Sequence, residues 1–523
     1  MPGKRLPARP ARVAVAALAA VALAATIGAS PAGEPRGQPR GEPPGEVAAP
    51  PPSRPALPAT APPPAAPGTT SVTPPPLGWS PCDSYQCSTL VVPLDYSDPA
   101  GPHIGVALQR RPASDPASRI GSLVLNPGGP GESGIGNFGK DLSVLPAGLL
   151  ERFDVVTFDP RGVGASEGIH CAGDTYHGPP PDPIPQTVAA EQTLLTADRD
   201  YADSCARSAG ALLAHVGTDD VARDLEQLRL AVGDPGLTYV GLSYGTMIGE
   251  AYAAMFPNHV RAMVLDGPLD PSLTTSQLAD AQAAGFEGSL ERFFSWCLAT
   301  PGSCPWRPSE DPHAAFAALA ASVRAHPLAV GGRTVGPNEL YTGTFGSLYA
   351  VSFWPGLGRA LAGVAAGDGT AMLGLYDGYQ RAGDPSFDGD ANNAVTCLDH
   401  PVPTDPAAYP QLAAAAARVA PDFGPVFAWG ALSCAVWPVP PDRTPAPVHA
   451  DGSPPILVVG TTGDPATPYA WARAVAASLT GGVLLTRTGV DHVALFTSAC
   501  VRAYDEAYLV SVTPPPPGTT CPS

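Results

Sequence analysis

The sequence predicts an α/β fold built on a mostly parallel, doubly wound sheet, with a large and mainly helical cap inserted late in the chain. Short, continuous Val/Leu-rich runs, each ending in a Gly-rich or Asp-containing turn, alternate with helical segments. Such runs are typical of strands buried on both faces of a parallel sheet. The alternation breaks over residues 271–450, which are Ala-rich and mostly helical in pattern. In this architecture the chemistry lies at the carboxyl ends of the strands.

Composition excludes some classes of function before any motif is considered. The chain has 523 residues, and its 44% of hydrophobic residues suffices for a large buried core, which excludes global disorder. Its formal net charge is −18. Because an acidic protein repels phosphate backbones, we expect no nucleic-acid partner. We expect no cofactor and no metal, and the sequence does not predict an oligomeric state.

The N-terminus has the pattern of an export signal. Four basic residues precede an apolar run, Val13–Ile27, which is shorter than the roughly 20 residues of a membrane-spanning helix. We expect residues 1–30 to be a cleaved signal peptide, so that membrane anchoring is not expected afterwards. Residues 31–78 contain 17 Pro among 48 positions and predict a disordered tether. The expected localisation is secreted or cell envelope.

The ten cysteines fit an exported protein, because disulfides persist in oxidising compartments. Their number is even and no C-x-x-C motif occurs, which argues against zinc and dithiol redox chemistry. Many pairings are formally possible. Pairing neighbours in the sequence predicts Cys82–Cys87, Cys171–Cys205, Cys297–Cys304, Cys397–Cys434 and Cys500–Cys521.

Residues 79–270 form the first part of the predicted core. Strands are expected at 88–96 and 103–110, and an amphipathic helix at 218–232 with Thr218 as its cap. Buried strands are expected within 122–129, 153–162, 237–243, 262–267, 456–464 and 483–489.

A glycine-rich loop, N-P-G-G-P-G-E-S-G, follows the strand that ends near Asn126. Backbone donors that stabilise an oxyanion need a close approach to the substrate, which glycine permits. Proline has no N–H, so we expect Gly129 to be the donor, with Gly128 as second choice and the Tyr244 amide as the other donor. The loop lacks the Lys and Ser/Thr of a phosphate-binding loop.

The candidate nucleophile is Ser243. The segment G-L-S-Y-G, residues 241–245, joins a predicted strand to a predicted helix, which is the context of a nucleophile elbow. The same pattern occurs around Ser166, in G-A-S-E-G, but without a strand directly before it or an apolar helix after it. We therefore assign Ser166 to loop structure.

The cap (residues 271–450) holds five of the seven Trp residues, which we expect in its own core. Residues 451–523 complete the core and supply two further candidate groups. Asp464 follows one buried strand and is the expected acid, and His492 follows the next strand and is the expected base. Asp266 and Asp270 are alternative acids, and Asp491 is a weaker one because it adjoins His492 in sequence.

Together, the motifs N-P-G-G-P-G-E-S-G, F-D-P-R-G-V-G, G-L-S-Y-G-T, G-D-P-A-T-P-Y and D-H, with a Cys-flanked tail, resemble the secreted tripeptidyl aminopeptidases of actinobacteria and the related mycobacterial cell-envelope serine protease. The resemblance runs from about residue 79 to the end. It implies an α/β-hydrolase fold of the proline-iminopeptidase superfamily and a serine exopeptidase that releases short peptides, tripeptides in particular, from free N-termini. It also implies Ser243 as nucleophile, Asp464 as acid, His492 as base and Thr467 as a supporting position.

An exopeptidase needs a group that binds the substrate's ammonium, and acidic side chains are suited to it. Glu132, Glu250 and Asp399 are the candidates. Three other functions stay open: an esterase or lipase with the same triad, a prolyl aminopeptidase, and a catalytically inactive binding module.

Overall fold

A computed structural model describes residues 74–171, 180–308, 311–381 and 384–523. The predicted signal peptide, residues 1–30, and residues 31–73 of the predicted tether lie outside the described residues.

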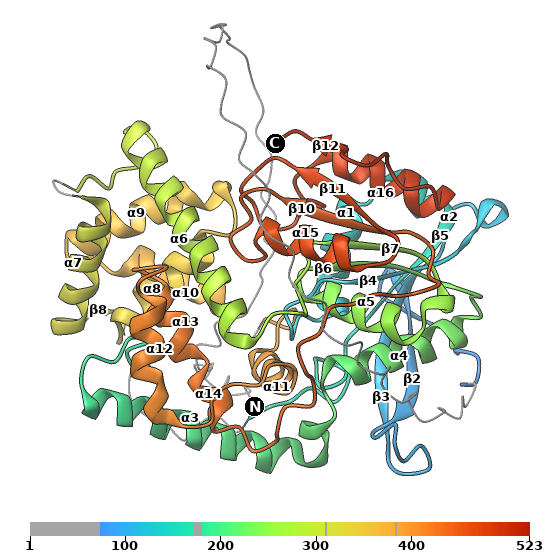
Figure 1. Cartoon of the computed structure of the whole chain (residues 1–523), viewed down its shortest axis with the longest axis horizontal. Coiled ribbons are helices and arrows are strands. Elements are labelled where there is room, and N and C mark those ends of the chain that lie inside the picture. Colours follow the sequence, from blue (N-terminus) through green and yellow to red (C-terminus); the bar gives the residue numbers. More distant parts are fainter. Residues whose placement is uncertain (1–73, 172–179, 309–310, 382–383) are drawn as a thin grey trace, which may run out of the picture.

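A ten-stranded sheet forms the centre of the molecule (Figure 1). Its antiparallel edge consists of β1 (Ser80–Cys82), β2 (Tyr85–Pro93) and β3 (His103–Arg111). The β2 strand begins and ends three residues earlier than predicted, because it pairs with β1 in a hairpin that the Cys82–Cys87 disulfide closes. Seven parallel strands follow in the spatial order β5 (Phe153–Phe158), β4 (Gly121–Asn126), β6 (Leu237–Leu242), β7 (Val260–Asp266), β10 (Ile456–Thr461), β11 (Gly482–Arg487) and β12 (Thr520–Cys521).

Helices cover both faces of this sheet. One face packs on α1 (Gly134–Val144), α2 (Ala147–Arg152) and α16 (Ala499–Ser511). The other packs on α4 (Thr218–Val232), α5 (Tyr244–Met255) and α15 (Tyr469–Ser478). Neighbouring strand residues point to opposite faces, as with Leu123 and Val124 of β4. Both faces of β4 to β7 are therefore buried, which is why these strands read as continuous apolar runs.

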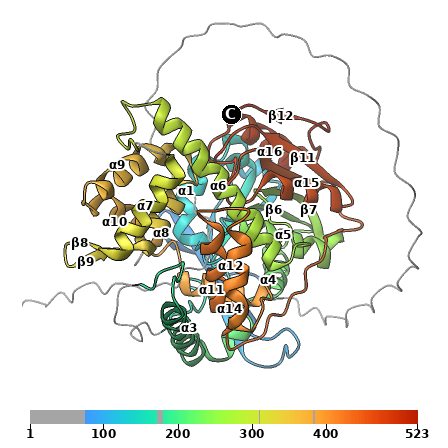
Figure 2. The ribbon, with the colours of Figure 1, turned by 60° about the vertical axis from the view of Figure 1, so that its left-hand side comes forward.

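The helices between β7 and β10 lie beside the sheet (Figures 1 and 2). They are α6 (Thr275–Ala299), α7 (Pro312–Ala325), α8 (Pro337–Ser347), α9 (Trp354–Ala365), α10 (Thr370–Gln380), α11 (Gly389–Asp399), α12 (Tyr409–Ala416), α13 (Gly424–Gly430) and α14 (Leu432–Ala435), with a hairpin of β8 (Leu328–Val330) and β9 (Arg333–Val335). Most of them share a separate core rich in aromatic rings, in which Phe286 contacts Phe345 and Phe427. Trp306 and Trp354 belong to this core, whereas Trp437 packs into the core of the sheet.

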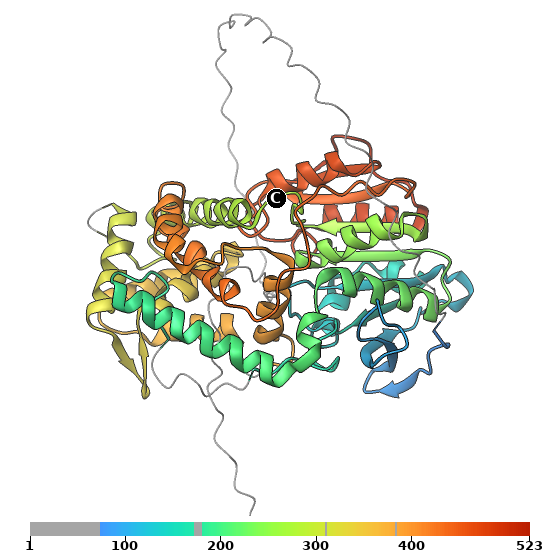
Figure 3. The ribbon, with the colours of Figure 1, turned by 60° about the horizontal axis from the view of Figure 1, so that its bottom comes forward.

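Two helices connect the cap to the sheet in ways that the sequence pattern does not show. Helix α3 (Val188–Ala209) precedes β6, yet it runs along the cap (Figure 3), where Leu195 packs with Tyr409 and Trp429. Conversely, α11 belongs to the cap in sequence, but its apolar residues Ala394, Val395 and Leu398 pack into the core of the sheet. The two parts of the molecule are therefore interlocked.

Five disulfides join the neighbouring cysteines of the sequence in the predicted pairs. No helix in the described part of the chain is both long and apolar enough to cross a bilayer.

Candidate active site

Ser243 lies in a sharp turn between β6 and α5. Its backbone has φ 53° and ψ −123°, a region that residues other than glycine rarely adopt, as expected for a nucleophile elbow. The turn leaves no space for larger neighbours: a Cβ atom on Gly241 would lie 2.3 Å from the Gly245 carbonyl oxygen. The glycines on both sides of Ser243 are therefore sterically required. Ser166, in the second copy of the pattern, lies in a buried turn, where its Oγ donates to the Asp159 carbonyl.

Asp464 and His492, which follow β10 and β11, are hydrogen-bonded to each other. The His492 Nδ1 atom lies 2.9 Å and 3.0 Å from the two carboxylate oxygens of Asp464. The Asp464 Oδ1 atom also accepts hydrogen bonds from the Ala466 and Thr467 amides, both at 2.9 Å. The His492 side chain is 2% exposed and that of Asp464 is fully buried. Because Nδ1–H donates to the carboxylate, the imidazole carries its free lone pair on Nε2.

Thr467 contacts both members of this pair. Its Oγ1 donates to Asp464 Oδ2 at 3.1 Å and lies 3.3 Å from His492 Nδ1. The hydroxyl thus adds a side-chain donor to the carboxylate and is well placed to hold its orientation.

The alternative acids have other partners. Asp266 accepts the amides of Ala494 and Leu495, which fixes the loop just after His492, and burial raises the pKa of Asp266 to about 6. Asp270 bonds to Ser272. Asp491 accepts the Val351 amide and pairs with Arg487 at 2.9 Å. None of the three has a hydrogen bond to His492.

No hydrogen bond joins Ser243 Oγ to His492 Nε2, and Nε2 is buried without a partner among the residues that the structure describes. Ser243 follows β6 and His492 follows β11, with β7 and β10 between these strands, but the loop after β11 reaches back to the end of β7. A Cβ atom on Gly267 would lie 3.4 Å from His492 Cε1, and Gly267 follows Asp266, which pairs with Leu242 just before Ser243. Catalytic hydrogen bonds are often long in the absence of substrate and shorten when it binds.

The glycine-rich loop packs directly against the elbow. A Cβ atom on Gly128 would lie 3.1 Å from the Tyr244 nitrogen and 3.2 Å from the Ser243 Cβ, so only glycine permits this approach. The Gly128 amide donates to Asn126 Oδ1 at 3.0 Å. That bond occupies the Gly128 amide, which argues against Gly128 as an oxyanion donor.

The three acidic candidates for ammonium binding have different surroundings. Glu132 lies in the glycine-rich loop, where its Oε2 accepts from Asn137 at 2.7 Å and pairs with Arg381 at 3.1 Å. Its Oε1 is buried and has no partner in the described part of the chain. Glu250 is fully buried within α5, neither of its oxygens has a hydrogen-bond partner among the described residues, and burial raises its pKa well above the ordinary range. Asp399 uses both oxygens to bond Thr218.

Cap residues contact the same loops. The Tyr349 carbonyl accepts the His492 amide at 2.9 Å, and the Tyr349 ring stacks edge-on against the imidazole. Gln282 of α6 donates to the Ala466 carbonyl, next to Asp464. Sequence reasoning missed both residues, because a helical apolar pattern shows which face is buried but not which loop it covers.

One further group of side chains has the composition of a metal site. Ligand atoms of Glu287, His313 and Asp422 lie within 4.8 Å of one another in the cap. They already satisfy one another, since His313 Nδ1 pairs with Asp422 at 2.6 Å and the Glu287 carboxylate accepts backbone amides. This arrangement explains the cluster as a contact between cap helices.

Comparisons with known proteins agree with this fold. Residues 121–305 match the family model described as alpha/beta hydrolase fold, and residues 420–521 match the model described as TAP-like protein. The serine protease Hip1 of Mycobacterium tuberculosis is 37% identical over 85% of this chain and 90% of its own length. Carboxylesterase B of the same organism is 35% identical, over 83% and 86%. The tripeptidyl aminopeptidase of Streptomyces lividans is 32% identical over 83% of each chain. The chain therefore belongs to the α/β-hydrolase family that includes these serine proteases and tripeptidyl aminopeptidases.

Proposed function

We propose that this protein is an exported serine exopeptidase that releases short peptides, tripeptides in particular, from the free N-termini of peptide substrates. The observation that carries the proposal is the buried Asp464–His492 pair, whose imidazole lies close to Gly267, beside the Ser243 elbow. The five disulfides support an oxidising, extracellular location. Relatives that are named serine protease and tripeptidyl aminopeptidase support a peptide substrate.

The proposed reaction proceeds through an acyl-enzyme. Ser243 Oγ attacks the scissile carbonyl carbon while His492 Nε2 takes its proton, and Asp464 stabilises the resulting imidazolium. The amides of Gly129 and Tyr244 donate to the oxyanion. His492 then gives the proton to the leaving amine, the C–N bond breaks, and a water molecule deprotonated by His492 hydrolyses the ester on Ser243.

Among the three acids, Glu132 is best placed to bind the substrate's ammonium group. It belongs to the glycine-rich loop, and its buried Oε1 has no partner in the described structure. Burial raises the pKa of Glu132, while the positive charge of Arg381 opposes this rise. An incoming ammonium would supply the missing hydrogen-bond donor. Glu132→Gln should therefore lower kcat/KM for unblocked peptides with little effect on fluorophosphonate labelling of Ser243.

The decisive experiment is mass spectrometry of the products from matched unblocked and N-acetylated peptides. Fixed short fragments from the unblocked peptides alone are expected, and their loss in Ser243→Ala assigns the activity to this serine. Cleavage of the acetylated peptides at an equal rate would refute exopeptidase action.

An esterase is the second candidate, because carboxylesterase B is 35% identical to this chain. Esters and amides react through the same tetrahedral intermediate, so the triad does not distinguish them. Chromogenic tripeptidyl anilides and short acyl esters do: hydrolysis of the acyl ester alone would favour the esterase. Absence of fluorophosphonate labelling at Ser243 would instead favour an inactive binding module.

A further inference from the structure

Helix α11 lies between the cap and the sheet, and residues 391–399 of it are all buried. Buried helices of this kind are normally apolar on every side. This one instead carries Asn392, Asn393 and Asp399, whose side chains bond to other parts of the molecule. Burying a polar side chain costs free energy unless hydrogen bonds compensate for the lost water contacts. A satisfied buried network also makes the surrounding structure more rigid.

The N-terminal end of α11 is bonded to the glycine-rich loop. Asn392 Nδ2 donates to the Pro130 carbonyl at 2.8 Å, and the Asp388 amide donates to the Gly131 carbonyl at 2.8 Å. The approach is close, because a Cβ atom on Gly131 would lie 2.2 Å from the Asp388 carbonyl oxygen. The loop that holds Gly129 therefore cannot move outward while α11 is in place.

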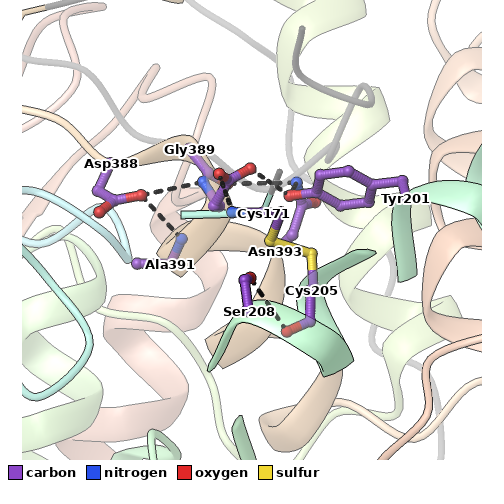
Figure 4. The surroundings of a disulfide bond; sticks show 9 residues. Cys171, Tyr201, Cys205, Ser208, Asp388, Gly389, Ala391 and Asn393 are labelled. Atoms are coloured by element: carbon purple, nitrogen blue, oxygen red, sulfur yellow. Dashed lines mark hydrogen bonds between the residues drawn. A yellow bond between two sulfur atoms is a disulfide. The ribbon is translucent and has the colours of Figure 1, made fainter. Parts of the chain in front are cut away.

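The same end of α11 is tied to helix α3 (Figure 4). Asp390 accepts the Cys171 amide at 2.8 Å and the Tyr201 hydroxyl at 2.7 Å, and Asn393 donates to the same hydroxyl at 3.1 Å. The Cys171–Cys205 disulfide closes this junction. The start of α11 thus has a rigid support on the side away from the glycine-rich loop.

The C-terminal end of α11 is linked through Thr218 to Tyr244, the residue that follows Ser243. Asp399 accepts the Thr218 amide at 3.0 Å and the Thr218 hydroxyl at 2.5 Å. The Thr218 hydroxyl in turn lies 2.6 Å from the Tyr244 hydroxyl. Tyr244 is the residue whose amide is the second proposed oxyanion donor, directly after Ser243.

We propose that α11 sets the relative position of the two oxyanion donors, with Asn392 and Asp399 as its positioning residues. The proposal rests on the proposed function. The two donors come from segments more than a hundred residues apart, and α11 is bonded directly to one segment and, through Thr218, to the other. Oxyanion donors act only if they lie within a few tenths of an ångström of the productive position. A helix that bridges both segments supplies that constraint.

The test compares Asn392→Ala and Asp399→Asn with Asn393→Ala. Asn393 is a matched control, because it is the same residue type on the same helix, equally buried, and Asp390 still holds α11 on Tyr201 and Cys171 when it is lost. Each protein is assayed for kcat and KM on an unblocked tripeptidyl anilide and for inhibition by a peptide aldehyde, whose adduct on Ser243 carries an oxyanion.

We expect kcat to fall about tenfold to a hundredfold in Asn392→Ala and in Asp399→Asn, with KM changed less than about threefold. The aldehyde inhibition constant should rise by the same factor as kcat/KM falls. Asn393→Ala should lower the thermal midpoint without these kinetic changes. If Asn392→Ala fails to fold, Asp399→Asn and Tyr244→Phe, which removes only the hydroxyl, carry the test.

Wild-type kcat and aldehyde affinity in both positioning variants would overturn the proposal. An equal fall of kcat in Asn393→Ala would also overturn it, because the loss would then reflect helix stability alone. Ser243→Ala separates this failure from failure of the proposed function: if that variant is inactive while the positioning variants are unaffected, only the role of α11 is refuted.

Discussion

Replacing Asp464 by Asn tests the proposed catalytic pair most directly. The Asp464 Oδ1 atom accepts the Ala466 and Thr467 amides, so an Asn oxygen in that place keeps two backbone bonds. The amide nitrogen then takes the place of Oδ2, where it faces the Val493 amide, the Thr467 hydroxyl and His492 Nδ1. As a donor it favours the imidazole tautomer with its proton on Nε2, which cannot accept a proton from Ser243.

The expected loss follows from that tautomer change. In serine triads it costs about 10⁴-fold in kcat, or about 5.4 kcal/mol of barrier. The fold should persist, because leaving the Val493 amide without its acceptor lowers the free energy of unfolding by only about 1–3 kcal/mol. The measurement is kcat on the tripeptidyl anilide, with thermal unfolding as a check on structure.

Asp491→Asn is the matched control. Asp491 adjoins His492 in sequence but bonds to Val351 and Arg487, so its variant should keep kcat within about threefold. A kcat for Asp464→Asn within tenfold of wild type would refute the tautomer argument. A comparable loss in both variants would refute the choice of Asp464 over Asp491.

Three other perturbations have defined outcomes. Thr467→Val removes the hydroxyl donor to Asp464 and should lower kcat about tenfold, the equivalent of one bond to a charged group, whereas Thr467→Ser should retain kcat. Gly128→Ala would place a Cβ atom 2.4 Å from the Leu242 carbonyl oxygen at φ +101°, so kcat and the rate of fluorophosphonate labelling should both fall about 100-fold; unchanged labelling would contradict this packing. Burial raises the pKa of Asp399 to about 6 in the folded protein, so its protonation favours folding by up to about 3 kcal/mol below pH 4, and this contribution is lost as the pH rises through 6. Asp399→Asn should therefore gain stability relative to wild type between pH 5 and pH 7.5 in paired thermal melts, and an equal difference at both pH values would be inconsistent with the raised pKa.

The parts of the site that sequence could predict are those encoded in short windows. Ser243 directly follows a strand, and Asp464 and His492 lie in the loops after two others, so a local pattern places each of them at the same edge of the sheet. The order of the serine, the acid and the histidine along the chain predicts that Asp464 pairs with His492, and this hydrogen bond is present in the structure.

Long-range hydrogen bonds account for what the sequence did not predict. Helix 218–232 has the predicted bounds, but the prediction that Thr218 caps it was wrong, because Gly217 is the cap residue and the Thr218 side chain bonds Asp399 and Tyr244 instead. A threonine before a helix has a strong local preference for capping. Here the Thr218 hydroxyl instead donates to the buried carboxylate of Asp399, 181 residues away in sequence. No short sequence window around Thr218 contains Asp399, so a local pattern does not predict this bond.

The same long-range contacts decide how the cap can act. If the whole cap opened as a lid, Asn392 would leave Pro130, the Tyr349 carbonyl would leave the His492 amide, and Asp399 would leave Thr218. Each step breaks a buried or partly buried hydrogen bond, and Ala394, Val395 and Leu398 would also leave the core of the sheet. Opening would therefore disrupt the loops that hold the proposed catalytic residues. We therefore expect substrate to enter while α11 stays in place.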